Sequence, residues 1–397
     1  MKAAMLSRMH TRRIGIFAML AMLALTAAMP ARAQNAVEPA VPTPFDAPIA
    51  YLVDLTNGQI LHAREADRRF VPASITKAMT LFHAFELMEE GALKPGQITT
   101  MRADTWREWS RKGSTMFIGA NDRVLVDDLL MGIANVSAND GSVMLAEAHA
   151  GSVAQWTAGM NARAAALGMT DSHFGTPNGW PDDGGTFTSA RDLVKLAEAL
   201  VSRHPHKFAR YIGRSGFRFN GIEQDNHDPL IGRTLGADGI KTGYTNEAGF
   251  GYLGTAARDG QRLALVIAGA PRANLRNRAA RAYMEWGFAA FEQVRLFEAG
   301  EMVARVAVQG GEVRELEVQA NRPVHINIPR GSAASPHIAV RYDGPLKAPI
   351  GSGEIVAYLE VTGEGISTAR VPLHAARQVR QANVFERIVN AVIGWFA

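Results

Sequence analysis

The chain has 397 residues, 47% of them hydrophobic and 20% charged, which is typical of a soluble globular protein with two domains. It contains no cysteine, so disulfides, thiol nucleophiles and thiolate metal sites are excluded. Five of the 42 lysines and arginines, and none of the 38 acidic residues, lie in residues 1–33, so the remainder carries a formal charge of −1. With no basic stripe left, we expect no nucleic-acid partner.

Residues 1–33 have the three parts of a secretory signal peptide. A basic start precedes an apolar run over residues 14–28, and Ala31-Arg32-Ala33 is a small-x-small cleavage site. The alternative, an uncleaved membrane anchor, needs about 20 apolar residues, more than this run provides. The pair Arg12-Arg13 leaves twin-arginine export open, although Gly15 favours general secretion. We therefore expect an exported protein.

Residues 34–293 predict an α/β domain. The stretch AYLVDLTNGQILHA alternates apolar and polar residues around Asn57-Gly58, which predicts a hairpin with a tight primed turn. A helix is expected over residues 74–90, and helical patterns continue to about residue 202. Two alternating runs, GFGYLGTAA and RLALVIAGA, then predict strands, and a helix is expected over residues 275–291. Strands at both ends of the segment indicate one sheet assembled from distant parts of the chain.

The residue pattern changes after about residue 294. Short alternating runs separated by glycine and proline predict a small all-β domain over residues 294–374. Residues 375–397 return to helical periodicity, with Val384, Phe385, Ile388, Val389, Val392, Trp395 and Phe396 along one side. This amphipathic helix suits attachment to a membrane surface. The alternative is a helix docked on the β domain.

Ser74 and Lys77 lie three residues apart at the expected start of a helix, so both fall on one face. Helix N-terminal NH groups and the helix dipole favour an oxyanion there, and a desolvated lysine can take the proton from a serine hydroxyl. Taken alone, the pair more often means a helix-capping serine beside a solvated lysine. Other motifs must decide between these interpretations.

Two further motifs carry polar side chains that suit a cleft. Ser137 and Asn139 lie in a break between two apolar helical runs, where the plain alternative is a turn with a helix cap. Lys241, Thr242 and Gly243 precede an alternating strand, where the glycine would let a ligand approach the backbone. The alternative for this segment is a strand end with a surface lysine.

Two patterns suggest other functions but lack the sequence context that those functions require, and a third pattern is absent. The G-x-G-x-x-G match at residues 249–254 is followed by a strand rather than a helix, which excludes dinucleotide binding. His204, His206 and His227 have no H-E-x-x-H helix or acidic partner pattern, so we interpret them as solvated loop histidines and expect no metal. No G-x-S-x-G elbow is present, which argues against an α/β-hydrolase triad.

The order Ser74-Ile-Thr-Lys77, Ser137-Ala-Asn139, Lys241-Thr-Gly243 is the signature of penicillin-binding proteins and serine β-lactamases. The surrounding segments DGIKTGYT, TSARDL, WGF, IPRG and GSTMF narrow the likeness. The chain resembles low-molecular-mass D-alanyl-D-alanine carboxypeptidases of the type 5 penicillin-binding protein group over nearly all of residues 34–397. The resemblance implies a transpeptidase-like catalytic domain with an antiparallel sheet and a helical cluster, then an all-β domain and an amphipathic anchor helix.

The resemblance also implies a role for each motif residue. Ser74 would be the acylated nucleophile, Lys77 its base and Ser137 a proton relay. Asn139 would hold the substrate amide, Lys241 would support the proton network electrostatically, and Thr242 and Arg276 would bind the terminal carboxylate. Gly243 and Tyr244 are further substrate-binding positions, and the backbone NH groups of Ser74 and Tyr244 would form the oxyanion hole. Arg272 and Arg278 lie close to Arg276 in sequence, and position 244 is often histidine in this group.

The resemblance thus implies a periplasmic serine DD-carboxypeptidase that removes the terminal D-alanine of peptidoglycan pentapeptides and is inhibited covalently by β-lactams. It needs no metal or organic cofactor, and the tail would attach it to the inner-membrane surface. Two rivals remain. A β-lactamase shares the acylation residues, although no E-x-x-L-N segment follows Ser137. A non-catalytic peptidoglycan-binding protein would keep the cleft without turnover.

Overall fold

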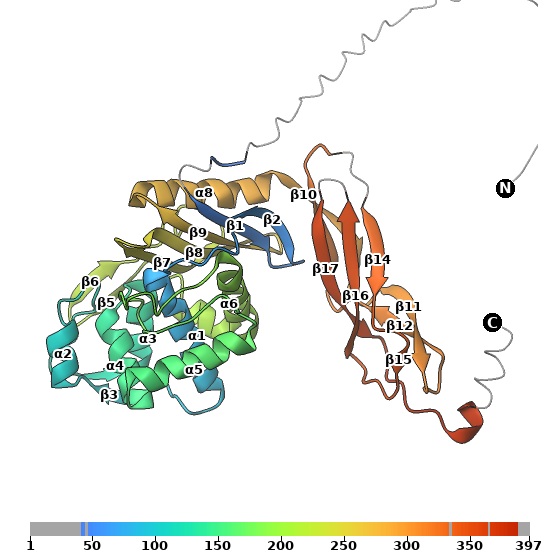
Figure 1. The fold of residues 1–397 in the computed structure, drawn as a ribbon, viewed down its shortest axis with the longest axis horizontal. Helices are drawn as coiled ribbons and strands as arrows, with labels where there is room; N and C mark the ends of the chain where they lie inside the picture. The colour runs from blue at the N-terminus through green and yellow to red at the C-terminus, as the bar shows by residue number, and fades with distance from the viewer. Residues whose placement is uncertain (1–40, 44–46, 333–335, 364–365, 388–397) are drawn as a thin grey trace, which may run out of the picture. The chain divides into compact units, whose positions relative to one another are not determined.

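The computed structural model describes residues 41–43, 47–332, 336–363 and 366–387, and it contains an α/β domain and an all-β domain (Figure 1). The expected signal peptide lies outside the described residues. The first domain is organised on a five-stranded sheet with the order β2-β1-β9-β8-β7, and every neighbouring pair is antiparallel. The strands are β1 (Ile49–Asp54), β2 (Gln59–Arg64), β7 (Ala237–Thr245), β8 (Gly249–Arg258) and β9 (Gln261–Ala270).

This sheet joins segments that lie more than 200 residues apart, as expected from the sequence. Ala264 of β9 stands opposite Val53 of β1, and Lys241 of β7 stands opposite Leu253 of β8. Strand β7 is at the edge, so one side of its backbone has no sheet partner. Two two-stranded sheets accompany it: β3 (Ile98–Thr100) with β4 (Arg123–Leu125), and β5 (Gly216–Phe219) with β6 (Ile222–Asp225).

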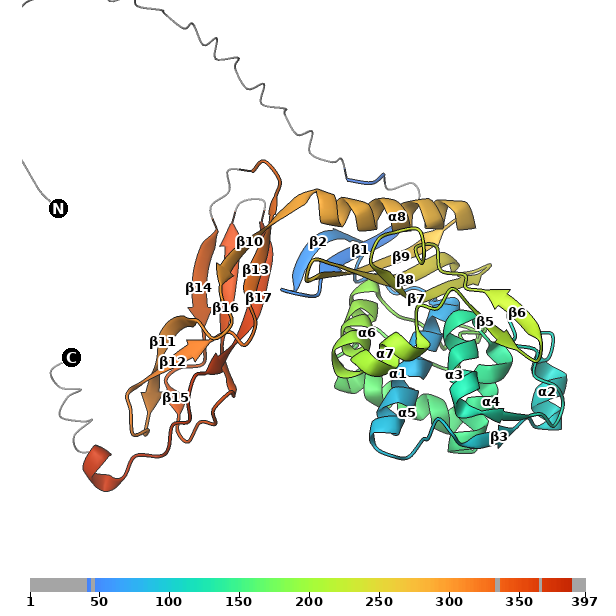
Figure 2. The ribbon, with the colours of Figure 1, turned by 180° about the vertical axis from the view of Figure 1, so that it is seen from behind.

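Helices cover both faces of the five-stranded sheet (Figures 1 and 2). Helix α8 (Ala273–Ala289) lies on one face, where its Tyr283 and Met284 share an apolar cluster with Leu263 and Ile267 of β9. The other face carries the helical cluster. Its helices are α1 (Thr76–Glu89), α2 (Ala103–Trp109), α3 (Val126–Asn135), α4 (Asn139–Ala150), α5 (Val153–Ala166), α6 (Ala190–Arg203) and α7 (Pro205–Tyr211).

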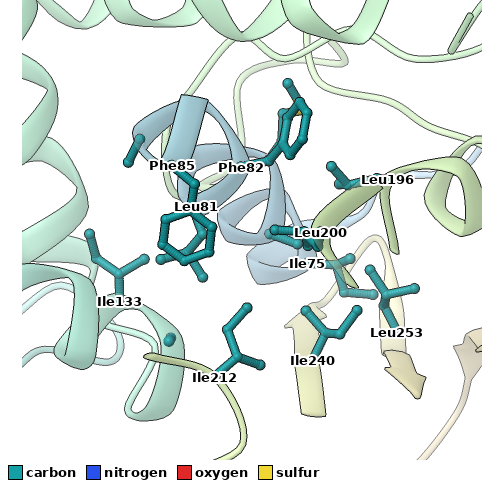
Figure 3. Packing of buried hydrophobic residues seen from close by; sticks show 14 of the residues in the cluster. Ile75, Leu81, Phe82, Phe85, Ile133, Leu196, Leu200, Ile212, Ile240 and Leu253 are labelled. Carbon is teal, nitrogen blue, oxygen red and sulfur yellow. The ribbon is translucent and has the colours of Figure 1, made fainter. Parts of the chain in front are cut away.

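Helix α1 runs through the centre of this cluster and is buried on every side over its first ten residues. Figure 3 shows Phe82 and Phe85 in one cluster with aliphatic side chains of other helices, among them Ile133 of α3 and Leu196 and Leu200 of α6. At its start, Ile75 packs near Ile240 of β7 and Leu253 of β8. Because these residues are enclosed in a close-packed interior, the N-terminus of α1 is held rigidly against β7.

Two local predictions differ from the structure. The helix expected from residue 74 begins as a 3-10 turn, Ala73–Ile75, and becomes α-helical at Thr76. The expected two-residue primed turn is wrong: four residues, Leu55 to Gly58, connect β1 and β2, and Gly58 has a φ of +77°. The wider loop lets the Asn57 side chain bind the NH of Gln59 and the carbonyl of His325.

The all-β domain has one six-stranded sheet with the order β14-β16-β17-β12-β11-β15 and one two-stranded sheet, β10-β13. An apolar cluster that includes Val318, Ile326, Leu359 and Leu373 fills its core. Its strands are β10 (Phe291–Phe297), β11 (Met302–Gln309), β12 (Glu315–Gln319), β13 (Val324–Pro329), β14 (His337–Arg341), β15 (Leu346–Lys347), β16 (Ile355–Gly363) and β17 (Ile366–Ala375).

The chain after β17 continues along this domain. Val379 is buried and bridges Ile350, and the NH of Ala382 donates to the carbonyl of Gly310. A short helical turn follows at residues 384–387, where Val384 and Phe385 are each 75% exposed. The remaining apolar positions of the expected amphipathic helix, from Ile388 onward, lie outside the described residues.

A buried histidine makes the stability of the α/β domain depend on pH. The His83 ring lies 4.6 Å from the Trp156 ring, centroid to centroid, in an edge-to-face contact. Burial, followed by the charge of Arg163, lowers the pKa of His83 from 6.5 to about 4. The folded chain therefore keeps this imidazole neutral between these two values, where an unfolded chain protonates it.

Acidification from pH 7 to pH 5 should therefore destabilise the protein through His83. The histidine's contribution is complete above pH 6.5 and is lost as the pH falls toward the folded value, up to about 2 kcal/mol over this interval. His83→Gln should reduce the pH dependence of the free energy of unfolding, measured with denaturant at both pH values. His206→Gln, at an exposed position of α7, is the matched control. An unchanged pH dependence in His83→Gln would contradict this assignment.

Candidate active site

The side chains of Ser74 and Lys77 meet at the start of α1. Lys77 is fully buried, and its Nζ lies 2.9 Å from Ser74 Oγ, 2.7 Å from Asn139 Oδ1 and 2.7 Å from the carbonyl oxygen of Asn178. The solvated lysine that the sequence left open is thereby excluded. Each of the three acceptors is uncharged, so nothing in contact with the amine compensates a positive charge.

Burial holds the pKa of Lys77 well below its usual range, the charge of Lys241 lowers it further, and Asp140 opposes both effects. A neutral amine has two protons and one lone pair. The carbonyl of Asn178 can only accept a hydrogen bond. Asn139 presents its side-chain oxygen to the amine, because its Nδ2 donates to the carbonyl of Lys112 at 2.9 Å. The lone pair is therefore left for Ser74, whose hydroxyl can donate to the amine.

Ser137 and Asn139 come from the connection between α3 and α4. Ser137 is buried and has a φ of +62°, a conformation that costs free energy for a residue with a side chain. The backbone NH of Asn139 donates to the carbonyl of Ser114, and the adjacent Asp140 accepts from the backbone NH groups of Met116 and Ile118. These bonds fasten the segment after Lys112 to the start of α4.

Lys241, Thr242 and Gly243 lie on β7, the edge strand that faces Ser74. A Cβ on Gly243 would lie 2.5 Å from the carbonyl oxygen of Pro72, so only glycine allows this approach to the 3-10 turn. Lys241 is buried, and burial, together with the charge of Arg276, lowers its pKa to about 7 despite the opposing effect of Asp228. The alternative of a surface lysine is therefore excluded at this position as well.

Tyr244 follows Gly243 on β7 and lies at the rim of the site. Its ring stacks on Phe250, with 4.1 Å between the centroids, and its hydroxyl donates to Asn246 Oδ1. The residue is 51% exposed, so this tyrosine contributes an aromatic surface at the rim of the cleft. A backbone NH can serve an oxyanion with either side chain.

Arg276 enters the cleft from the first turns of α8. Its guanidinium is buried, and Nη1 donates to the carbonyl of Gly251 at 2.9 Å. Of the three neighbouring arginines that the sequence offers, it is the one that lines the cleft. Nε donates to Asn277 Oδ1 at 2.7 Å, which leaves Nη2 to suit an anion at this end.

These segments enclose a cleft of about 350 Å³. Lys77 and Lys241 lie beneath its surface, and the other predicted site residues line it. No carboxylate is among its lining residues, which are Ser74, Gly113, Ser114, Ser137, Asn139, Asn178, Gly179, Trp180, His227, Thr242, Gly243, Tyr244, Thr245, Phe250 and Arg276.

Sequence reasoning missed the loop Asn178–Trp180. Its carbonyl at Asn178 is one of the three acceptors of the Lys77 amine, and Gly179 has a φ of +73°. A Cβ on Gly179 would lie 1.8 Å from the carbonyl oxygen of Ala73. The segment Pro177-Asn178-Gly179 carries an ordinary turn signal, which indicates a loop but not its contact with α1.

The histidines do not form a metal site in the described ranges, where no group of three or more metal-ligating side chains gathers. One interpretation from the sequence is wrong: His204 is buried rather than solvated. Its Nε2 lies 2.7 Å from Glu86 Oε1, and its ring packs against Phe82 and Phe85. The histidine joins α6 and α7 to α1. The G-x-G-x-x-G match lies on β8.

Two family models match the chain. The model described as D-alanyl-D-alanine carboxypeptidase matches residues 34–272, and the model of the penicillin-binding protein 5 C-terminal domain matches residues 291–381. D-alanyl-D-alanine carboxypeptidase DacA of Escherichia coli K12 is 31% identical over 359 residues, which are 89% of this chain and 88% of the relative.

Solved structures show the same likeness. Penicillin-binding protein 5 of Haemophilus influenzae superposes with a TM-score of 0.74 at 29% identity, over 86% of this chain and all of that one. Penicillin-binding protein D2 of Listeria monocytogenes in its ampicillin-bound form has a TM-score of 0.56 at 28% identity, over 62% of this chain and all of that one. The chain therefore belongs to the D-alanyl-D-alanine carboxypeptidase family of serine peptidases.

Proposed function

We propose that this carboxypeptidase removes the terminal D-alanine of peptidoglycan pentapeptides through an acyl-enzyme on Ser74. The observation that carries the assignment is the buried Lys77 amine, 2.9 Å from Ser74 Oγ and in contact with neutral acceptors alone. Lys77 takes the hydroxyl proton as Ser74 Oγ bonds to the carbonyl carbon of the penultimate residue. The C–N bond then breaks, and D-alanine leaves with a proton delivered through Ser137.

Hydrolysis completes the cycle. A water molecule attacks the ester, its proton passes to Lys77, and the Ser74 oxygen leaves the acyl carbon and recovers a proton. The backbone NH groups of Ser74 and Tyr244 hold the oxyanion in both steps, and β7, as an edge strand, has NH groups free for such a role.

The substrate would lie along β7 with its terminal carboxylate at Thr242 and Arg276. This end of the cleft has Arg276 at its surface and Lys241 beneath it, and no lining carboxylate opposes them. At the other wall, Asn139 Nδ2 keeps one proton beyond its bond to the carbonyl of Lys112, which suits the carbonyl of the substrate amide.

Labelled penicillin and a short peptide separate this function from its rivals. A carboxypeptidase releases D-alanine from a diacyl-Lys-D-Ala-D-Ala peptide and keeps the penicilloyl group, as the solved ampicillin-bound relative suggests. A β-lactamase would release hydrolysed penicillin rapidly, and a non-catalytic binding protein would release no D-alanine.

Lys77→Ala should acylate about 10² to 10⁴ times more slowly than the natural chain, since it loses the general base. The rate is measured by stopped-flow labelling with a fluorescent penicillin, and circular dichroism verifies the fold. Ser74→Ala is the reference for complete loss and should show neither labelling nor D-alanine release. An adduct located on another residue by mass spectrometry, or acylation of Lys77→Ala at the natural rate, would contradict the mechanism.

Gly179→Ala should impair the Lys77 base although the substitution does not alter Lys77 itself. The added Cβ would overlap the carbonyl oxygen of Ala73, so the loop must move and carry the Asn178 carbonyl away from Lys77. We expect acylation to slow at least tenfold and the pH of half-maximal acylation to change, because the Lys77 amine loses one of its hydrogen-bond acceptors. Gly184→Ala, a positive-φ glycine with open space around it, is the matched control. Equal rates in both variants would refute the role of this loop.

We further propose that the enzyme works in the periplasm, attached to the inner membrane through its C-terminal residues. Val384 and Phe385 are exposed at the start of this segment, and the basic Arg387 follows them. None of the helices in the described part of the chain is long and apolar enough to cross a bilayer. Peripheral attachment through an amphipathic segment fits these observations.

Deletion of residues 384–397 should release active enzyme from the membrane fraction. The cut is placed after the segment that packs on the β domain through Val379 and Ala382, so the fold should be retained. The measurement is D-alanine release in the soluble and membrane fractions. A truncated enzyme that stays with the membrane would contradict surface attachment, and one that unfolds would favour a docked helix.

A further inference from the structure

We propose that His227 is a specificity residue that binds the substrate's terminal carboxylate together with Thr242 and Arg276, and that it takes up a proton as this anion enters. The inference rests on the proposed carboxypeptidase function and extends it to a residue that no sequence motif marks. His227 lines the same cleft as Ser74, Thr242 and Arg276.

The backbone on both sides of His227 is fixed, although the imidazole itself is free. Asn226 Nδ2 donates to the carbonyl of Arg214 at 2.7 Å, and Asn226 Oδ1 accepts from the NH of Asp228 at 2.9 Å. Asp228 Oδ1 in turn accepts from the NH of Leu230 at 2.7 Å. Among the hydrogen bonds of the described residues, none involves the His227 ring, and its residue is exposed. A rigid turn therefore presents an imidazole with two unused nitrogens to the cleft.

The charges around this imidazole are predominantly positive. Lys241 on β7 and Arg276 on α8 lie within electrostatic range of it, and a third nearby amine, Lys77 on α1, has a pKa well below its usual range because of burial. The carboxylate of Asp228 is the acidic neighbour in sequence, but it is buried and directed at backbone NH groups and the Tyr252 hydroxyl. No lining carboxylate balances the cations in the described cleft. Such a pocket is complementary to a small anion.

Partial desolvation by the cleft walls and then the positive charges of Lys241 and Arg276 lower the pKa of His227. A bound carboxylate reverses the electrostatic part of this effect, since a negative charge next to an imidazole favours its protonated form. Binding is then linked to proton uptake, and by linkage the affinity for a carboxylate-terminated peptide must fall as the pH rises. The binding of a substrate without that carboxylate is not coupled to proton uptake by His227.

The ligand class follows from this chemistry. His227 would favour peptides that end in a free α-carboxylate over those that end in an ester or amide, because only the former supplies an anion. The residue does not touch the bond that breaks, so its effect belongs to KM rather than to kcat.

The test compares two substrates that use the same nucleophile and base. The first is diacetyl-Lys-D-Ala-D-Ala, and the second is diacetyl-Lys-D-Ala methyl thioester, whose leaving group has no carboxylate. For the natural enzyme, the ratio of kcat/KM for the peptide to kcat/KM for the thioester should fall between pH 6 and pH 9. The ratio cancels the titration of Lys77 in the chemical step, which is common to both substrates, whereas Lys241, whose pKa is about 7, lies near the carboxylate and is separated from His227 only by the variants.

His227→Ala should raise KM for the peptide about tenfold, with kcat within a factor of two, and leave kcat/KM for the thioester unchanged. It should also flatten the pH dependence of the ratio. His227→Gln, which retains a hydrogen-bond donor but cannot be protonated, should recover part of the lost affinity and none of the pH dependence. His206→Ala, at the exposed position of α7, is the control and should match the natural enzyme.

Three results would overturn the inference. Equal loss on both substrates would mean that His227 acts in the chemical step, and an unchanged peptide KM in His227→Ala would mean that it has no role. A ratio that keeps its pH dependence in His227→Ala would assign the proton to another group. A natural enzyme inactive on both substrates would instead refute the proposed function, so the two failures are distinguishable.

Discussion

The burial of the Lys77 amine among neutral oxygens is the interaction on which the rest of the site depends. An ammonium group in this position would lose its hydration and gain no carboxylate contact, so the amine is held in its basic form. Its three acceptors come from the 3-10 turn, the start of α4 and the loop at Asn178. The basicity of one side chain is therefore a property of the tertiary fold, because no single segment supplies the environment.

Two close backbone approaches make this environment possible. Gly243 brings the edge strand β7 against the turn that carries Ser74, and Gly179 brings its loop against the carbonyl of Ala73. Each approach removes space that water would otherwise occupy around Lys77. The central position of α1, whose first ten residues are buried, gives these segments a rigid surface to pack against. The core of the domain and its chemistry thus share one helix.

The parts of the site that the sequence predicted are those with fixed spacing along one element. Ser74 and Lys77 share a helical turn, and Lys241 to Gly243 share a strand, so local periodicity was sufficient. Which of the neighbouring arginines enters the cleft depends on the orientation of α8 over the sheet, and only the structure distinguishes Arg276 by its contacts. The sequence model of the sheet was also right in outline, since alternating runs at both ends of the domain pair in it.

The missed features depend on contacts between distant segments. The Asn178 carbonyl is a backbone group, which carries no residue signature, and His227 is one histidine in a polar loop. His204 was interpreted as a solvated loop residue because it stands in a polar stretch directly before Pro205, yet its ring packs against Phe82 and Phe85. The primed turn failed because Asn57 uses its side chain to reach the β domain. In each case a tertiary contact overrode a sound local expectation.

The positive charge of the cleft has two effects that act in opposite directions during binding. In the empty site the charge of Lys241 helps to keep Lys77 deprotonated, and the same charge attracts an anionic substrate. A bound carboxylate partly neutralises the charge of Lys241, so that this charge lowers the pKa of Lys77 less once the anion is bound. Burial, however, is the larger cause of the lowered pKa of Lys77, and the substrate increases burial by displacing water from the cleft. The base therefore remains deprotonated when the substrate arrives, because its state depends mainly on desolvation and only secondarily on the charges that recognise the substrate.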